Sequence, residues 1–419
     1  MRFIHTADIH LDSPLHGLSA YQDAPAEQLR GASREAFRQL VTTAIDERVD
    51  FMVVAGDLYD GDWPDFNTGL FFCAEMGRLQ RASIPAYVLF GNHDAESQMT
   101  RALRLPGNVA RFSASACQTH TIEHLKVALH GRSFKVRDTT DNLAQSYNAP
   151  LRGYFNIGVL HTALQGGFGE HANYAPCTLD ELHAKGYDYW ALGHVHEHKV
   201  WAGASTVCFP GNLQGRSIRE TGRRGAVLVT VDDGGPPQVE RLFIDVLRWE
   251  HVAVDVSACD SLDAVGIAAS RQLAALLETD AQVPRAVRVS LQGACPVHGL
   301  LFQHEQALRA QVLSEIAAIA PERLWLEKVK LATRPVGTAA AGVLGGDALA
   351  ELQALLAEAR HDEALLKELR DDFNQMLAKA PDLLGEVAAL RQARDGDLAA
   401  VLDSVVPGLL ARLAMQENN

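Results

Sequence analysis

The segment FMVVAGDLYD at residues 51–60 joins an apolar run to a Gly-Asp pair. A short apolar run that contains β-branched residues and ends at a glycine predicts a buried strand of a parallel sheet. Gly56 permits a tight exit from that strand, which presents the carboxylate of Asp57 at the strand end. Ligands of such sheets bind at the carboxyl ends of the strands. The segment therefore predicts an α/β domain with a polar site at one end of its strands.

Four further segments repeat this arrangement of an apolar run beside polar side chains. They are ADIH at 7–10, GNHD at 91–94, LH at 160–161 and GHVH at 193–196. Their carboxylates, amide and imidazoles are all donors for divalent transition metals. One such residue at one strand end is usually structural or solvated, whereas several strand ends that each bring a metal-type donor indicate a metal site.

The predicted metal ligands are Asp8, His10, Asp57, Asn92, His161, His194 and His196. Asp57 could bridge two ions, as carboxylates of two-metal sites do. His93 is expected to be the catalytic acid, because an imidazole can protonate a leaving oxygen. Asp94 is expected to assist catalysis by orienting that ring, as carboxylates often do for histidine.

Composition limits the classes of protein that the chain can belong to. The 419 residues are 47% hydrophobic, which favours two or three globular domains. The formal net charge of −14 argues against a surface that binds nucleic acid everywhere, so any such contact must be local, metal-assisted or shared with a partner. The six cysteines include no close-spaced pair, which favours a reducing cytoplasm. No apolar run is long enough to predict a membrane span or a secretion signal.

The apolar pattern changes along the chain and predicts four regions. Residues 1–249 alternate apolar runs with helical patterns, and residues 250–335 predict a second, smaller α/β domain. A linker rich in Gly, Ala and Pro follows at 336–347, and residues 348–419 predict a helical tail. Amphipathic helices on a linker must bury their apolar faces against a neighbour, either the body of the chain or a partner protein.

In their order along the chain, the motifs closely resemble the pattern of the calcineurin-like metallophosphoesterases, D-x-H, GD, GNH[DE], H and GHxH. Within that superfamily, ADIHLD at 7–12 and GDLYD at 56–60 resemble the SbcD-type DNA repair exonucleases. The segment FPGNLQGRSIRE at 209–220 is similar to the YhaO-like branch, with Phe209 and Leu213 where that branch commonly has Tyr and Pro. The resemblance is strong over the first domain and weak beyond it.

The resemblance implies a four-layer sandwich, in which helices flank two β-sheets, with a small α/β capping domain and a helical C-terminal tail. It also implies two divalent cations, expected to be Mn²⁺. One would be bound by Asp8, His10, Asp57 and His196, and the other by Asp57, Asn92, His161 and His194. The implied activity is cleavage of DNA phosphodiesters in repair, as an exonuclease or also an endonuclease, beside an SbcC-like coiled-coil ATPase. Arg216, in the YhaO-like segment, is expected to contact the DNA backbone.

Two other functions fit the same motifs. The ions and His93 would equally hydrolyse a small phosphodiester such as a cyclic nucleotide, although a second domain and a tail are superfluous for that substrate. A scaffold subunit with a purely structural metal site is the non-enzymatic alternative, and the presence of His93 and of every ligand counts against it. The second domain could shape a substrate groove or serve dimerisation, which leaves self-association open.

Overall fold

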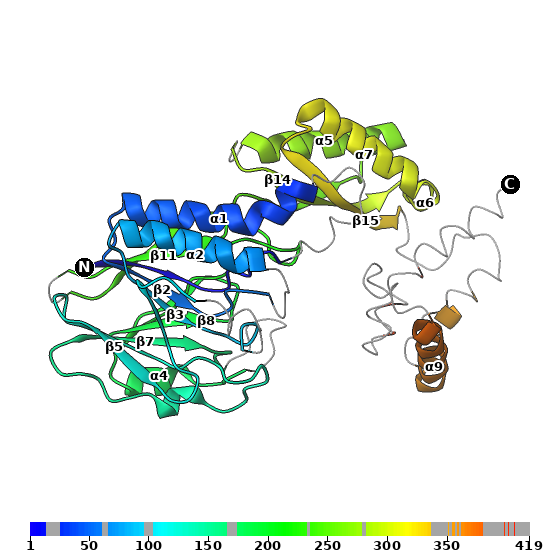
Figure 1. The fold of residues 1–419 in the computed structure, drawn as a ribbon. Coiled ribbons are helices and arrows are strands. Elements are labelled where there is room, and N and C mark those ends of the chain that lie inside the picture. Colours follow the sequence, from blue (N-terminus) through cyan, green and yellow to red (C-terminus); the bar gives the residue numbers. More distant parts are fainter. Residues whose placement is uncertain are drawn as a thin grey trace. The chain divides into compact units, whose positions relative to one another are not determined.

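The computed structural model describes residues 1–13, 26–60, 66–95, 104–165, 174–232, 235–278, 282–336 and 362–379, and short stretches and single positions between 351 and 406. The described residues fall into two units, with the first ending at Trp249 and the second beginning at Glu250. Figure 1 shows both in the colours of the sequence. Each unit is described by itself.

The first sheet of unit 1 has six strands in the order β12-β11-β1-β2-β3-β4. Their bounds are β1 Arg2–Thr6, β2 Phe51–Ala55, β3 Ala86–Leu89, β4 Val109–Arg111, β11 Gly225–Thr230 and β12 Gln238–Phe243. Strands β1 to β4 are parallel, whereas β11 pairs antiparallel with both β1 and β12. The carboxyl ends of β1, β2 and β3 therefore lie together at one end of the sheet.

The second sheet also has six strands, in the order β5-β6-β7-β8-β10-β9. Their bounds are β5 Gln118–Ile122, β6 Val127–Gly131, β7 Phe155–His161, β8 Tyr189–Gly193, β9 Lys199–Trp201 and β10 Thr206–Phe209. The four central strands are parallel, and the two edge strands are antiparallel to their neighbours. The ends of β7 and β8 thus lie side by side.

The two sheets pack face to face through a shared apolar core. The ring of Phe3 in β1 stacks on Phe51 with centroids 4.8 Å apart and meets Tyr189 of the other sheet edge-on at 5.5 Å. Aromatic pairs in these two geometries add to the stabilisation that burial of the rings supplies. The core between the sheets fixes how the strand ends of one sheet face those of the other.

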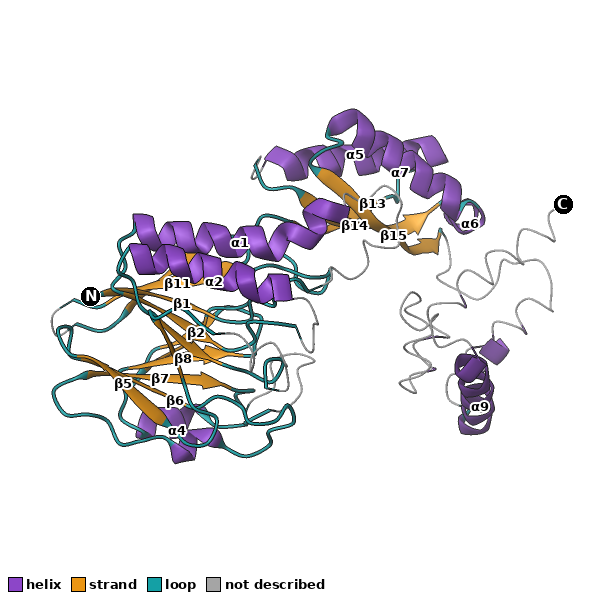
Figure 2. Cartoon of the chain, viewed as in Figure 1, coloured by secondary structure: helices purple, strands orange, loops and turns teal. Residues whose placement is uncertain are grey.

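Helices cover both outer faces, as Figure 2 shows. Helices α1, Ala26–Asp46, and α2, Phe66–Arg81, lie on the first sheet, where Phe37 and Leu40 are fully buried against Val54. Their spacing of three residues places both side chains on one helix face. Helix α4, Leu179–Ala184, and the 3-10 turn η1, Leu143–Ser146, lie on the second sheet. Helix, sheet, sheet and helix make four layers, which confirms the predicted fold class.

Unit 2 contains a three-stranded sheet in the order β13-β14-β15. Its elements are β13 Arg248–Asp255, α5 Leu262–Glu278, β14 Arg285–Cys295, α6 His298–Gln303, α7 Glu305–Ile319 and β15 Leu324–Pro335. Strands β14 and β15 are parallel, and the helices bury Val265, Leu308 and Val312 against the sheet. This unit has its own apolar core and a mixed α/β architecture.

Beyond residue 336, the structure gives the bounds of helix α9, Glu363–Lys379, and describes scattered helical positions besides it. Most of the expected linker at 336–347 and much of the expected tail at 348–419 lie outside the described residues. Across the ranges that are described, no helix is both long enough and apolar enough to cross a bilayer.

Candidate metal centre

The polar side chains at the strand ends of both sheets converge in unit 1. Asp8 and His10 follow β1, Asp57 follows β2, and Asn92 follows β3. His161 ends β7, and His194 and His196 follow β8. All seven residues are buried, with residue exposures from 0% for His161 to 7% for His196. Buried carboxylates and imidazoles at this density need a compensating charge or hydrogen bonds, because burial of a charged group is costly.

The loops that present these residues have an unusual backbone. Asp8, His10 and Asp57 have φ angles of 50°, 46° and 52°, in the left-handed region that non-glycine residues rarely adopt. Backbone hydrogen bonds of 3.0 Å hold them, from Asp8 N to Gly56 O and from His10 N to Asp57 O. Strained conformations of this kind cluster at functional sites, where the surroundings hold them in place.

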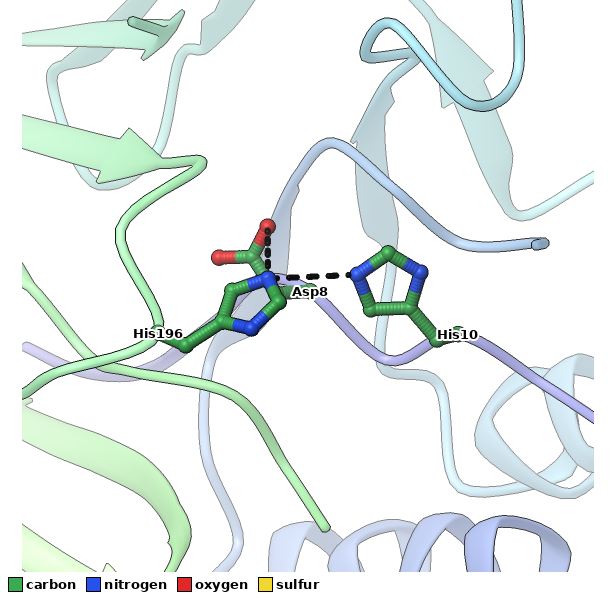
Figure 3. A group of neighbouring side chains, drawn as sticks. All are labelled: Asp8, His10 and His196. Atoms are coloured by element: carbon green, nitrogen blue, oxygen red, sulfur yellow. Dashed lines mark hydrogen bonds and ion pairs between the residues drawn. The ribbon is translucent and has the colours of Figure 1, made fainter. Parts of the chain in front are cut away.

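Asp8, His10 and His196 form a first group, drawn in Figure 3. Their ligand atoms all lie within 4.8 Å of one another. The Nε2 atoms of His10 and His196 are 3.3 Å apart, and the same atom of His196 is 3.9 Å from Asp8 Oδ1. Burial lowers the pKa of His10 to about 3, so its imidazole is neutral and has a free lone pair. Two imidazoles and a carboxylate facing one point fit a divalent cation.

Asp57, His161 and His194 form a second group. His161 Nε2 is 2.9 Å from Asn92 Oδ1 and 3.4 Å from Asp57 Oδ2. On the other side of its ring, Nδ1 donates to the carbonyl of Ala55 at 3.0 Å, which leaves the lone pair of Nε2 directed at the group. This group therefore also presents oxygen and nitrogen donors to one point.

The charges around His161 test whether a cation fits there. Burial lowers the pKa of His161, but the negative charges of Asp57 and Asp8 outweigh burial and raise it to about 9. The same negative potential that favours a protonated ring favours a metal cation at that position. The donor set and its electrostatics both fit a divalent ion.

Asp57 connects the two groups. Its Oδ2 is 3.4 Å from His161 Nε2 in the second group and 3.9 Å from His10 Nε2 in the first. Its other oxygen, Oδ1, accepts the backbone N–H of His93 at 3.0 Å, which fixes the rotation of the carboxylate. One oxygen of Asp57 thus faces both candidate cation positions.

The ring of His93 lies beside these groups, and the carboxylate against it belongs to Asp60. Asp60 Oδ1 is 3.0 Å from His93 Nδ1. Burial lowers the pKa of His93, but the hydrogen bond to Asp60 and the charge of Asp57 outweigh burial and leave the pKa above its usual value. Asp94 instead accepts backbone N–H groups of Leu58, Tyr59 and Gly91 at 2.9 to 3.1 Å. The orienting contact that the sequence assigned to Asp94 is therefore made by Asp60, while Asp94 braces two ligand loops.

The sequence does not indicate a role for two acidic residues that lie near the two donor groups. Asp60 lies within GDLYD and also accepts the hydroxyl of Ser13 at 2.7 Å. Glu220 ends FPGNLQGRSIRE, and its Oε1 is 2.7 Å from His196 Nδ1. Both stand inside segments that mark the resemblance, but the sequence alone does not indicate which ring each carboxylate meets.

Arg216 lies close to both acidic residues. Its guanidinium is 3.7 Å from Asp60 Oδ1 and 3.4 Å from Glu220 Oε1, and its side chain is 20% exposed. A partly exposed arginine next to His93 and Asp60 is placed to meet an anionic group that enters the site.

Comparison with known proteins gives the family. Residues 1–198 match the calcineurin-like phosphoesterases, and residues 249–334 match the middle domain of the metallophosphoesterase YhaO. The chain is 34% identical over 334 residues to the uncharacterized metallophosphoesterase YhaO of Bacillus subtilis (strain 168), a match that covers 77% of this chain and 81% of that protein.

More distant similarities include a curated protein and a solved structure. The DNA double-strand break repair protein Mre11 of Methanopyrus kandleri is 26% identical over 286 residues, which cover 61% of this chain and 60% of that protein. The solved structure of a dimetal phosphatase from Danio rerio is similar over 55% of this chain and 92% of that one, with 12% identity and a TM-score of 0.35. The motifs, the four-layer fold and the identity to YhaO over most of both sequences agree. The chain belongs to the YhaO-like branch of the calcineurin-like metallophosphoesterases, which are metal-dependent phosphoester hydrolases.

Proposed function

We propose that this protein is a two-metal-dependent DNA phosphodiesterase, an exonuclease that can also act as an endonuclease. The observation that supports it best is the placement of Asp57 Oδ2 between the two donor groups, 3.4 Å from His161 Nε2 and 3.9 Å from His10 Nε2. A carboxylate that bridges two cations is the usual core of two-metal phosphoryl-transfer sites.

In this proposal Asp8, His10, Asp57 and His196 bind one cation, and Asp57, Asn92, His161 and His194 bind the other. These residues would hold two divalent cations, which would supply charge neutralisation at the phosphate and activation of water for in-line attack on phosphorus. Mixed oxygen and imidazole ligation accommodates Mn²⁺, which is the proposed metal. The chain's own contribution is to hold seven buried donors at fixed positions before substrate arrives.

His93 is the proposed general acid. Its Nδ1 is held by Asp60 at 3.0 Å, so the proton that it transfers to the departing ribose oxygen comes from Nε2 at the opposite side of the ring. A general acid typically contributes about 10²- to 10⁴-fold in rate. Its raised pKa keeps the ring protonated over a wider range of pH.

Arg216 is the proposed contact for a backbone phosphate of DNA. Its guanidinium lies beside Asp60 and remains partly exposed, and arginine pairs with phosphate through two parallel hydrogen bonds. DNA is favoured over a small phosphodiester because relatives named as DNA double-strand break repair proteins match the chain, and because a second α/β unit follows the phosphoesterase domain.

We further propose that residues 250–335 shape the DNA groove and that the tail at 348–419 binds an SbcC-like ATPase. The six cysteines are all free, which suits a cytoplasmic enzyme. If co-purification with such an ATPase survived deletion of the tail, the proposed role of the tail would be wrong.

The test compares the purified chain with its His93→Ala variant on labelled single- and double-stranded DNA and on a small phosphodiester, with Mn²⁺ or with chelator. Cleavage of DNA that requires Mn²⁺ and is lost in the variant is the expected result. Hydrolysis of the small ester alone would favour a small-molecule phosphodiesterase. Bound Mn²⁺ without hydrolysis of any substrate would indicate a scaffold.

A further inference from the structure

The carboxylate of Glu220 makes four contacts beside the metal groups. Its Oε1 is 2.7 Å from His196 Nδ1 and 3.4 Å from the guanidinium of Arg216. Its Oε2 accepts the backbone N–H of Arg216 at 2.6 Å and the side-chain amide of Asn212 at 3.0 Å. The Glu220 side chain is only 13% exposed. Both oxygens therefore accept hydrogen bonds, and they do so in a place where few water molecules compete.

These contacts define which nitrogen of His196 carries its proton. The carboxylate of Glu220 accepts from the N–H groups of Arg216 and Asn212, so it is also the acceptor in its 2.7 Å contact with His196, and Nδ1 of His196 carries a hydrogen. The neutral ring then has its lone pair on Nε2, the atom that lies 3.3 Å from His10 Nε2 and 3.9 Å from Asp8 Oδ1.

The second oxygen of Glu220 stabilises the segment that contains Arg216. The backbone N–H of Arg216 and the amide of Asn212 both donate to it, and the Arg216 guanidinium then reaches to within 3.7 Å of Asp60. Asn212 is in turn held by Arg224, which also donates to the carbonyl of His196. One buried carboxylate thus connects a candidate metal ligand with the arginine proposed to meet the substrate phosphate.

We propose that Glu220 is a positioning residue that fixes the tautomer and orientation of His196 and thereby strengthens cation binding by Asp8, His10 and His196. This inference rests on the proposed two-metal function. Carboxylates that hold metal-ligating histidines typically change metal affinity by about 10- to 100-fold when they are removed. The second donor group should be insensitive to Glu220, because His161 is oriented by the carbonyl of Ala55.

The Glu220→Gln variant separates these contributions. Its amide oxygen can still accept from His196 Nδ1, but the charge is lost and its NH₂ group must then face the N–H donors of Arg216 and Asn212. Glu197→Gln is the matched control, because Glu197 is adjacent to His196 in sequence yet pairs with Arg224 at 2.8 Å and is 61% exposed. Both variants remove one carboxylate that binds an arginine, and only Glu220 contacts the imidazole.

The experiment titrates the metal-free full-length chain with Mn²⁺ and counts free ion by electron paramagnetic resonance. Wild type and Glu197→Gln should bind two Mn²⁺ per chain, whereas Glu220→Gln should bind one with unchanged affinity and the other about 10- to 100-fold more weakly. With Co²⁺ as the probe, the visible absorption of the weakened site should change as well. These readouts do not depend on turnover.

The inference would be overturned if wild type and Glu220→Gln bound Mn²⁺ with equal affinities. A lower melting temperature of the metal-free variant alone would mean that Glu220 is a purely structural residue. If Glu220→Gln does not fold, Glu220→Asp decides instead, and undiminished affinity at both sites would equally overturn it. Failure of the wild-type chain itself to bind two Mn²⁺ would contradict the proposed metal centre rather than the role of Glu220.

Discussion

Replacement of Asp60 by asparagine tests the proposed acid catalysis most directly. The amide oxygen of the introduced asparagine can still accept a hydrogen bond from His93 Nδ1, but the carboxylate charge is lost. A hydrogen bond to a charged partner contributes about 1.5–3 kcal/mol and a neutral one about 0.5–1.5 kcal/mol, a difference of about 1–1.5 kcal/mol. The side chains of His93 and Asp60 are 26% and 21% exposed, so solvent screens the pair only in part. The substitution should therefore slow DNA cleavage by about tenfold.

The leaving group shows whether this loss arises from proton transfer. A nitrophenolate leaves without protonation, whereas the ribose oxygen of DNA needs a proton. Asp60 Oδ1 also lies 3.5 Å from His10 Nδ1, so the comparison is made at saturating Mn²⁺. Turnover of a bis-nitrophenyl phosphate should then be nearly unchanged in Asp60→Asn while DNA cleavage falls. Ser13→Ala is the control, because it removes a hydrogen bond to Asp60 and leaves the charge in place. Equal losses on both substrates would refute the acid role, since a general disturbance of the site would explain them.

The same variant should change the pH profile in a defined direction. The negative charge of Asp60 favours protonated His93 and raises its pKa, and the acid is active only while protonated. Loss of that charge lowers the pKa, so the alkaline decline of DNA cleavage should begin at a lower pH in Asp60→Asn. A decline that stays at the wild-type pH would contradict the assignment of His93.

Three further substitutions test other parts of the site. Asp57→Asn removes the bridging charge, so metal analysis should find fewer Mn²⁺ ions per chain and turnover of every phosphodiester should be abolished. Retention of two tightly bound ions would exclude bridging. Gly56→Ala places a Cβ 2.3 Å from His161 Nδ1, at a residue with a φ of 100°. The variant should lower the free energy of unfolding, measured by denaturant titration, by about 1–3 kcal/mol. Unchanged stability would mean that the loop is not rigid. Arg216→Ala should weaken DNA binding and reduce the slope of its salt dependence by about one; an identical slope would show that Arg216 meets no phosphate.

The sequence alone indicates the candidate ligands because each stands directly beside an apolar run. The run FMVVA before Gly56 and Asp57 is recognisable as a buried strand. The position of the Asp57 carboxylate at the end of that strand therefore follows from local sequence alone. Local sequence therefore suffices to nominate Asp57 or His161. It also suffices for an α/β layered domain, since alternating apolar runs and helical patterns permit few layer arrangements, whereas the four-layer sandwich was implied by the family resemblance.

The partners of each side chain depend on contacts between residues far apart in sequence. Adjacency in sequence predicts that Asp94 orients His93, but Asp94 Oδ2 accepts from Gly91 N and Leu58 N and so stabilises the loop instead. Asp60, which lies far from His93 in sequence, reaches the ring because β2 and β3 are parallel neighbours that end together.

Local pattern alone thus determined the strands that carry the donor residues, the donor residues themselves and the family to which they point, since strand formation and chain exit depend on neighbouring residues. Only the tertiary structure decided that Asp57 faces two donor groups, that Asp60 holds His93 and that Glu220 holds His196. The physical reason is that two sheets, packed through Phe3, Phe51 and Tyr189, bring strand ends together from opposite halves of the domain. Hydrogen bonds and charges act over a few ångströms in space, and sequence separation says little about which groups come that close.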